Sequence, residues 1–189
     1  MAHCSLHEAQ EMMTSNHWTR AIFVREPKER FLSAYLDKVI QSNYVKSKCC
    51  QPNRVAEPAK CFEEAQNFKT FLNITEACYD IHWVPQSMRM DSEFLPYINF
   101  VGRYESLAND TMKLLKSLRN AYGEVAWDTY GKSGWGKDGM DAIYQGTKSH
   151  HATNAGDNVK QYYTPEVERM VEEAYRDDYI LFNFTRKFA

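Results

Sequence analysis

The stretch AIFVREPKERFLSAYLDK, residues 21–38, decides the fold of this 189-residue chain. Four apolar residues end abruptly at Arg25, and Pro27 then opens an amphipathic pattern. This order predicts a buried strand that leads directly into a helix. Pro27 suits the first helical turn, where its missing N–H leaves no hydrogen bond unmade. The apolar residues at helical spacing form one stripe that we expect to face the core: Phe31, Leu32, Tyr35, Leu36, Val39 and Ile40.

A polar flank of the same segment carries candidate binding residues. Arg30 and Ser33 are three residues apart, so they are neighbours on the helix surface, outside the apolar stripe. Ligands of open α/β sheets bind at the carboxyl ends of strands, which puts Arg25 where a phosphate would bind. Arginine gives bidentate contacts to phosphate, and serine adds a hydroxyl donor. The alternative is an ordinary strand, turn and helix whose arginines pair with Glu26 and Glu29.

Four blocks of the chain carry a common resemblance. FVREPKERFLSAY (residues 23–35) is followed by HWVPQ (82–86), FVGRYESLANDT (100–111) and YYTPEVERMVEEAYRDDYILFNF (162–184). In this order they resemble the Golgi carbohydrate sulfotransferases, a membrane-bound family that transfers sulfate from 3′-phosphoadenylyl sulfate (PAPS). The first block resembles the family's 3′-phosphate-binding motif, with Arg25 and Ser33 at its two defining positions. The resemblance covers about residues 20–184.

The resemblance implies an α/β fold of the partial P-loop-NTPase-like sulfotransferase kind. We expect one domain over residues 1–189, with a short parallel sheet flanked by helices. The family holds the 5′-phosphosulfate of PAPS on a PK-x-[GA]-[ST]-[ST]-like loop after an earlier strand. This chain reaches the 3′-phosphate motif within 25 residues, so we expect that N-terminal strand and loop to be missing.

The function implied by the resemblance is transfer of sulfate from PAPS to a glycan hydroxyl, without a metal. The acceptor would be a glycan or proteoglycan, and the location the Golgi lumen or membrane. The alternative is a non-catalytic sulfotransferase-like domain that binds a glycan or another partner. Because the family's 5′-phosphosulfate loop is not found, both functions stay open.

Further site residues also follow from the resemblance. The segment TKSHHATNA (residues 147–155) is similar to a His-Ala-Thr loop that lies near the cofactor in relatives. Lys160, which follows it, is therefore a candidate cofactor-binding residue beside Arg25, Arg30 and Ser33; the alternative is a solvated surface loop. His82 is the candidate catalytic base, or else serves the structure by bonding a backbone carbonyl.

Composition excludes several classes of function. A net charge of −2 argues against a nucleic-acid partner, which would require a basic face. No apolar run approaches the ~20 residues that span a bilayer, and the start of the chain lacks the apolar region of a signal peptide. The chain contains no C-x-x-C pair, which argues against a zinc site.

The cysteines instead suggest disulfides. Adjacent Cys49 and Cys50 do not easily bond each other, and we expect either to pair with Cys61 or Cys78 in an oxidising lumen. Sequons at Asn73, Asn109 and Asn183 are in keeping with such a compartment.

The remaining elements are predicted from periodicity and capping signals. We expect helices over residues 61–72 and 104–120, a strand over 98–101, and a long irregular loop over 121–156. Thr164 and Pro165 predict the start of a last helix that runs to about residue 177. The loop contains GKSGWGKD (residues 131–138), which lacks the final Ser or Thr of a nucleotide-binding P-loop. We therefore interpret it as a surface loop.

Overall fold

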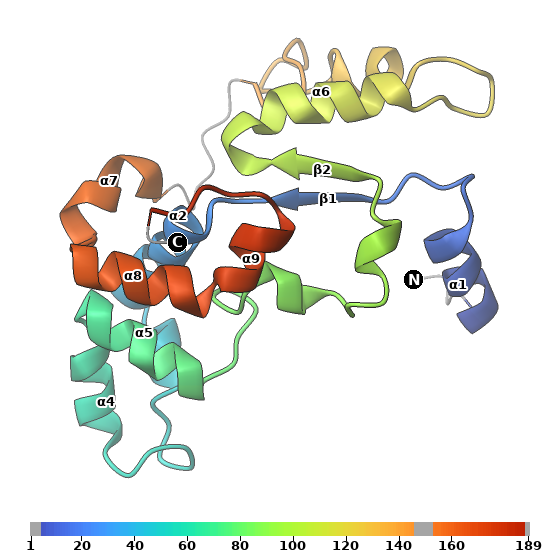
Figure 1. Cartoon of the computed structure of the whole chain (residues 1–189). Coiled ribbons are helices and arrows are strands. Elements are labelled where there is room, and N and C mark those ends of the chain that lie inside the picture. The colour runs from blue at the N-terminus through green and yellow to red at the C-terminus, as the bar shows by residue number, and fades with distance from the viewer. Residues whose placement is uncertain (1–4, 146–152, 188–189) are drawn as a thin grey trace. The chain divides into compact units, whose positions relative to one another are not determined.

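The computed structural model describes residues 5–145 and 153–187, and it divides into two compact units (Figure 1). Unit 1 comprises Met1–Arg25 and Met90–Ser149, and unit 2 comprises Glu26–Arg89 and His150–Ala189. The boundary falls inside the opening motif, so Arg25 belongs to unit 1 and Ser33 to unit 2.

The helices and strands of each unit are as follows. Unit 1 contains α1 (Leu6–Thr14), β1 (Ala21–Val24), β2 (Phe100–Arg103) and α6 (Leu107–Ser117), with a π-helical turn at Trp127–Gly131. Unit 2 contains α2 (Pro27–Tyr35), α3 (Tyr44–Lys48), α4 (Pro58–Ala65), α5 (Phe68–Ala77), α7 (Ala155–Tyr162), α8 (Pro165–Ala174) and α9 (Arg176–Leu181). A π-helical turn, Leu36–Ile40, continues α2. Single 3-10 turns cover Gln86–Arg89, Leu95–Tyr97 and Tyr104–Ser106. Among the described residues, no helix is long and apolar enough to cross a bilayer.

The sheet of unit 1 consists of β1 and β2, which run parallel (Figure 1). The prediction of a strand over residues 21–24 is confirmed, whereas the second strand begins two residues later than predicted, at Phe100. Gly102 lies opposite Phe23, and a β-carbon on Gly102 would come within 2.3 Å of the Phe23 ring. Only glycine allows the ring to lie across the neighbouring strand at this point.

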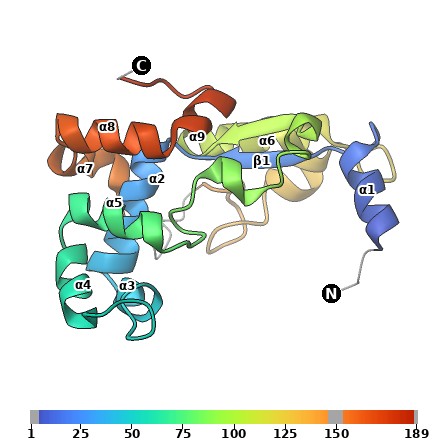
Figure 2. The same cartoon turned by 60° about the horizontal axis from the view of Figure 1, so that its bottom comes forward.

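Asp110 joins the end of β2 to α6, the helix that lies along the sheet of unit 1 (Figure 2). Its buried carboxylate accepts hydrogen bonds from the Arg103 backbone N–H (2.9 Å), the Ser106 hydroxyl (2.6 Å) and the Lys113 ammonium (2.8 Å). The Lys113 hydrogen bond, followed by those from Ser106 and Arg103, lowers the pKa of Asp110 to about 2. The carboxylate therefore fixes the strand end against the first turns of the helix.

The core of unit 2 is built around the apolar stripe of α2. Phe31 is fully buried, and its ring centroid lies 5.3 Å from those of Phe68 and Phe71 and 5.8 Å from that of Tyr175. The predicted stripe is confirmed except at Ile40, whose side chain is 50% exposed. The π-helical turn explains this difference, because it widens the helix and rotates its last residues away from the stripe.

Two predictions about helices in unit 2 are wrong. The helix expected over residues 61–72 is two helices, since the Asn67 side chain accepts a hydrogen bond from the Thr70 N–H and starts a new one. The irregular loop expected over residues 121–156 overlaps the first two residues of α7, a helix that was not predicted and that packs on α2. Its half-buried residues Val159, Tyr162 and Tyr163 have helical spacing, so the signal was present in the sequence.

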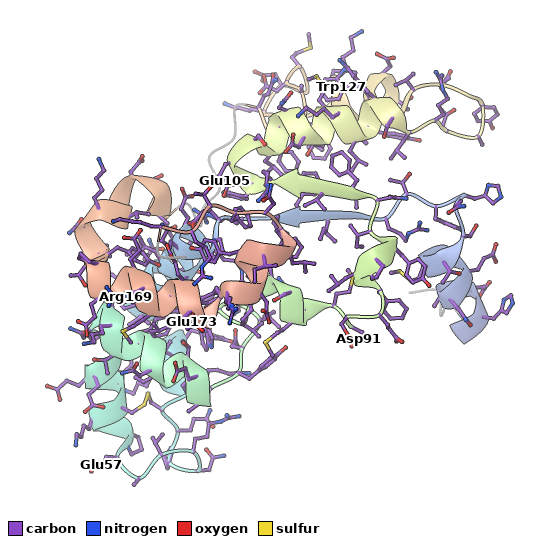
Figure 3. The ribbon with its side chains drawn as sticks, in the orientation of Figure 1. Glu57, Asp91, Glu105, Trp127, Arg169 and Glu173 are labelled. Atoms are coloured by element: carbon purple, nitrogen blue, oxygen red, sulfur yellow. A yellow bond between two sulfur atoms is a disulfide. The ribbon has the colours of Figure 1, made fainter. Side chains whose placement is uncertain are left out.

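The start of α8 is confirmed at Thr164 and Pro165, where the Thr164 hydroxyl accepts a hydrogen bond from the Val167 N–H. The helix is shorter than predicted, because the chain turns at Tyr175 before α9 begins. Exposed Arg169 and Glu173, labelled in Figure 3, mark the solvent side of α8.

Two disulfides cross-link residues 49–78 of unit 2. Cys49 bonds Cys78, and its neighbour Cys50 bonds Cys61. The prediction that each of the adjacent cysteines pairs with Cys61 or Cys78 is confirmed, although the sequence left the choice between partners open. The two bonds hold α3 and α4, and the end of α5, in fixed register.

We predict that the two disulfides differ in their contribution to stability. Replacing Cys49 and Cys78 with alanine should lower the free energy of unfolding by about 3.5 kcal/mol, and replacing Cys50 and Cys61 by about 3 kcal/mol, because the first pair closes the longer loop. Urea unfolding monitored by tryptophan fluorescence measures both. All three proteins should unfold at the same urea concentration once reduced. An equal or smaller loss for the Cys49–Cys78 pair would contradict the loop-length argument.

Candidate functional site

Ser33 lies in α2 on the flank opposite the core stripe. Its Oγ atom is 2.9 Å from Oγ1 of Thr153, a hydrogen bond in which either hydroxyl can donate. Thr153 belongs to the segment that resembles the His-Ala-Thr loop, 120 residues further along the chain. Unit 2 therefore brings together two segments that were singled out separately in the sequence.

Arg30 lies one helical turn before Ser33 and contacts a different partner. Its guanidinium donates hydrogen bonds to the backbone carbonyls of Val84 (2.7 Å) and Ile81 (3.0 Å). These carbonyls flank His82 and Trp83 of the HWVPQ block. Arg30 thus holds that block against the same helix that carries Ser33. A phosphate would have to displace these contacts in order to bind the same two nitrogens.

His82 forms part of a hydrogen-bonded cluster around Asp80. The buried Asp80 carboxylate contacts Nδ1 of His82, and it accepts hydrogen bonds from the His82 backbone N–H (2.9 Å) and the Tyr44 hydroxyl (2.7 Å). The Lys48 ammonium lies 3.4 Å from the same carboxylate. About a third of the His82 side chain is exposed. The carboxylate orients the imidazole through Nδ1, which leaves Nε2 as the ring nitrogen that can take up a proton.

The electrostatics of this cluster favour an ionised Asp80. Burial by itself would raise the pKa of the carboxyl, but hydrogen bonds from the His82 N–H, the Tyr44 hydroxyl and the His82 ring outweigh it and lower the pKa to about 2. The same hydrogen bond raises the pKa of Tyr44, because the phenol must stay protonated to donate it. Neither Asp80 nor Tyr44 was singled out in the sequence; the acidic residue two positions before His82 was the available signal.

The rest of the HWVPQ block is fixed by the core. Trp83 is buried and donates from Nε1 to the Cys78 carbonyl (2.6 Å), and the Tyr175 hydroxyl donates to the Trp83 carbonyl. The buried Asp178 carboxylate accepts from the backbone N–H groups of Gln86 (2.8 Å) and Ser87 (2.7 Å). His82 therefore extends from a backbone that is anchored on both sides.

The HWVPQ block also lines a pocket of about 320 Å³ in unit 2. Trp83, Val84 and Pro85 form one side of it, and Leu72 of α5 and Tyr175 lie among its other lining residues. The lining is mainly apolar, and neither Ser33 nor His82 belongs to it. The pocket is therefore separate from the two candidate side chains of unit 2, Ser33 and His82.

Arg25 follows β1 in unit 1. The carbon of its guanidinium lies 4.5 Å from the centre of the Tyr104 ring, which follows β2. The negative face of the aromatic ring attracts the cation, so Tyr104 helps to fix the position of the guanidinium. Glu105, labelled in Figure 3, is the next residue along the chain from Tyr104.

Lys160 and the remaining histidines are placed as follows. Lys160 is exposed in the last turn of α7. His7 and His17 are exposed in unit 1, whereas His3, His150 and His151 lie outside the described residues. Among the residues that the structure describes, no group of three or more His, Cys, Asp or Glu side chains could hold a metal ion.

Comparison with known proteins supports the resemblance to sulfotransferases. A model of the sulfotransferase family matches residues 2–185. The chain belongs to the sulfotransferase family. It is also similar to human carbohydrate sulfotransferase 9, with 27% identity over 192 residues that cover 92% of this chain. The matched region spans 39% of that relative's length. No solved structure shows a significant match to this sulfotransferase-family chain.

We predict that Asp80 makes the stability of unit 2 sensitive to acid. A carboxyl whose pKa is lowered by folding stabilises the protein above its usual pKa of 3.8, and that contribution is lost as the pH falls from about 4 to 2. Asp80→Asn should therefore cost about 2 kcal/mol at pH 7, and the difference from wild type should shrink as the pH falls through this range. Urea unfolding at several pH values measures it.

Tyr44→Phe is the matched variant, because it removes one hydrogen bond to Asp80 and leaves the carboxylate in place. It should show the same pH dependence at a smaller amplitude. A cost of Asp80→Asn that stays constant from pH 7 to pH 2 would contradict an ionised, hydrogen-bonded Asp80.

Proposed function

We propose that this chain is a carbohydrate O-sulfotransferase that transfers sulfate from PAPS to a glycan hydroxyl, and that its first motif binds the 3′-phosphate of PAPS. The observation that carries the proposal is the hydrogen bond between Ser33 and Thr153. This hydrogen bond joins α2, which carries Ser33 of the 3′-phosphate motif, to the segment that resembles the His-Ala-Thr loop. The family resemblance associates both parts with the cofactor. Membership of the sulfotransferase family supports the reaction class, and the carbohydrate sulfotransferase relative supports the acceptor class.

Each candidate residue has a defined part in the proposal. Arg25 and Ser33 bind the 3′-phosphate, Arg25 through its guanidinium and Ser33 through its hydroxyl. Thr153 adds a second hydroxyl beside Ser33. Lys160 supplies a positive charge on α7, the helix that packs on α2. Arg30 acts indirectly: it positions the HWVPQ block through the carbonyls it holds rather than touching phosphate.

The chemistry requires a base and a place for the developing negative charge. The acceptor oxygen attacks sulfur in line with the departing 5′-phosphate oxygen, so one S–O bond forms as another breaks and adenosine 3′,5′-bisphosphate leaves. The hydroxyl proton goes to Nε2 of His82, and Asp80 stabilises the resulting imidazolium through Nδ1. The family resemblance also supports a proposal about the fold. We propose that the sheet of unit 1 belongs to a sulfotransferase fold of the P-loop-NTPase-like kind.

We further propose that the protein works in the lumen of the Golgi. Two disulfides within thirty residues support an oxidising compartment, since such bonds are rare in reducing ones. The sequon asparagines Asn73, Asn109 and Asn183 are all exposed, as attachment of a glycan would require.

Binding of adenosine 3′,5′-bisphosphate tests the cofactor site directly. Arg25→Ala should weaken binding about 10- to 100-fold through loss of a charge-assisted contact, and Ser33→Ala about 3- to 10-fold through loss of a neutral one. Calorimetric titration measures both. Arg54→Ala and Ser117→Ala, changes of exposed residues outside the proposed site, are matched controls and should bind like wild type. If neither Arg25→Ala nor Ser33→Ala weakens binding, the assignment of these two residues to the 3′-phosphate site is wrong.

Turnover tests the part assigned to His82. His82→Gln should lower kcat for sulfate transfer at least 100-fold while leaving adenosine 3′,5′-bisphosphate binding unchanged, because general bases contribute about 10²- to 10⁴-fold. Transfer of radiolabelled sulfate from PAPS to a panel of oligosaccharides measures it. Full activity in His82→Gln would exclude this residue as the base. Nucleotide binding without transfer in the wild-type chain would instead favour the non-catalytic, glycan-binding alternative.

A further inference from the structure

Unit 1 presents large aromatic side chains on the loop that follows α6. Within residues 127–144, hereafter the aromatic loop, Tyr130 is 58% exposed, Trp135 45% and Tyr144 54%. Aromatic rings are the side chains with most to gain from burial, so several of them exposed in one short segment indicate an interaction surface.

The backbone of the aromatic loop is held by its own hydrogen bonds. Trp135 and Asp141 exchange two backbone hydrogen bonds (3.2 and 3.0 Å), and Gly134 donates to the Gly139 carbonyl (2.8 Å). The Trp135 indole donates to the Tyr130 carbonyl at 2.8 Å. These contacts bring the Trp135 ring beside the Tyr130 backbone. The aromatic side chains thus extend from an ordered turn.

A further contact adds Tyr144 to this group. The N–H of Ile143, its neighbour, donates to the carbonyl of Gly131, the neighbour of Tyr130 (2.9 Å). Tyr144 itself has a φ of 62°, in the left-handed region that residues with a β-carbon rarely adopt. Backbone strain of this kind persists only where the surrounding structure holds it, and it clusters at functional sites. We call Tyr130, Trp135 and Tyr144 together the aromatic patch.

The aromatic patch is supported from α6. The π-helical turn Trp127–Gly131 packs on α6, and Trp127, labelled in Figure 3, lies with its ring 6.0 Å from the Lys116 ammonium. A β-carbon on Gly131 would come within 2.4 Å of the Trp127 ring, so glycine lets the turn close over the indole. The base of the aromatic loop is therefore packed, while its outer rings remain exposed.

The charge of this region restricts the partner. Residues 116–145 carry four basic side chains and four acidic ones, so the region has no excess of cations. The basic residues are Lys116, Arg119, Lys132 and Lys137, and the acidic ones are Glu124, Asp128, Asp138 and Asp141. A polymer rich in sulfate or carboxylate requires an excess of cations for binding. Aromatic faces with neighbouring carboxylates instead suit a neutral sugar, whose C–H face packs on a ring and whose hydroxyls donate to carboxylate oxygens.

We infer that the aromatic patch is the binding surface for the acceptor of this chain, and that this acceptor is an uncharged glycan. The inference rests on the proposed carbohydrate sulfotransferase function and adds the chemical class of the acceptor. It also explains why a loop without nucleotide-binding chemistry keeps an ordered, exposed set of aromatic rings. A protein partner or a second copy of the chain is the competing occupant.

The test is glycan binding by the whole chain, without turnover. The probes are an array of neutral oligosaccharides ending in galactose, N-acetylgalactosamine or N-acetylglucosamine, with heparin and chondroitin sulfate as anionic probes. We expect retention of at least one neutral probe, and its affinity should fall at least tenfold in Trp135→Ala by calorimetric titration. Trp135→Phe, which keeps a ring, should retain most of the affinity and guards against a folding defect.

Trp18→Ala is the matched control, because Trp18 is a tryptophan of unit 1 with nearly the same exposure, 48%, outside the aromatic loop. It should bind the neutral probe like wild type. Preference for the anionic probes, equal binding by Trp135→Ala and wild type, or no glycan binding together with self-association that Trp135→Ala abolishes would each overturn the inference. Binding of adenosine 3′,5′-bisphosphate, measured on the same proteins, separates the two proposals. If the nucleotide binds and neutral glycans do not, the inference fails alone.

Discussion

Burial of Phe31 is the constraint on which the arrangement of unit 2 depends. Its ring is fully buried among aromatic rings from α5 and from the end of α8, which come from distant parts of the sequence. Arg30 precedes Phe31, and Ser33 follows two residues later, so fixing the apolar face of α2 also fixes the direction of its polar flank. Core packing therefore determines the positions of Arg30 and Ser33.

The parts of the fold that were predicted correctly are those with local causes. The strand ending at Arg25, the helix starting at Pro27 and the capped helix at Thr164 each follow from neighbouring residues. The break at Asn67 and the helix α7 were missed for different reasons. At Asn67, a single hydrogen bond from the Thr70 N–H to the amide side chain ended an otherwise continuous apolar pattern. At α7, the residues after the predicted loop were left without an element although a short helical period was present.

The candidate site shows the same limit of sequence information. Helical spacing placed Arg30 beside Ser33 correctly, but spacing specifies a flank and says nothing of partners. From the pattern alone, the Arg30 guanidinium is expected to bind phosphate. In the structure it donates hydrogen bonds to the carbonyls of Ile81 and Val84, about fifty residues away. Conversely, the contact between Ser33 and Thr153 joins two segments whose resemblance was visible but whose proximity was not.

The disulfide at Cys78 has a practical consequence for preparing the protein. Cys78 lies two residues before Asp80, and its carbonyl accepts the hydrogen bond of the Trp83 indole. A purification buffer that contains thiols would release the anchor of the segment that orients His82. An enzyme purified in this way would look like a domain that binds without turnover. Handling under non-reducing conditions is therefore needed before a lack of activity can be attributed to the chain itself.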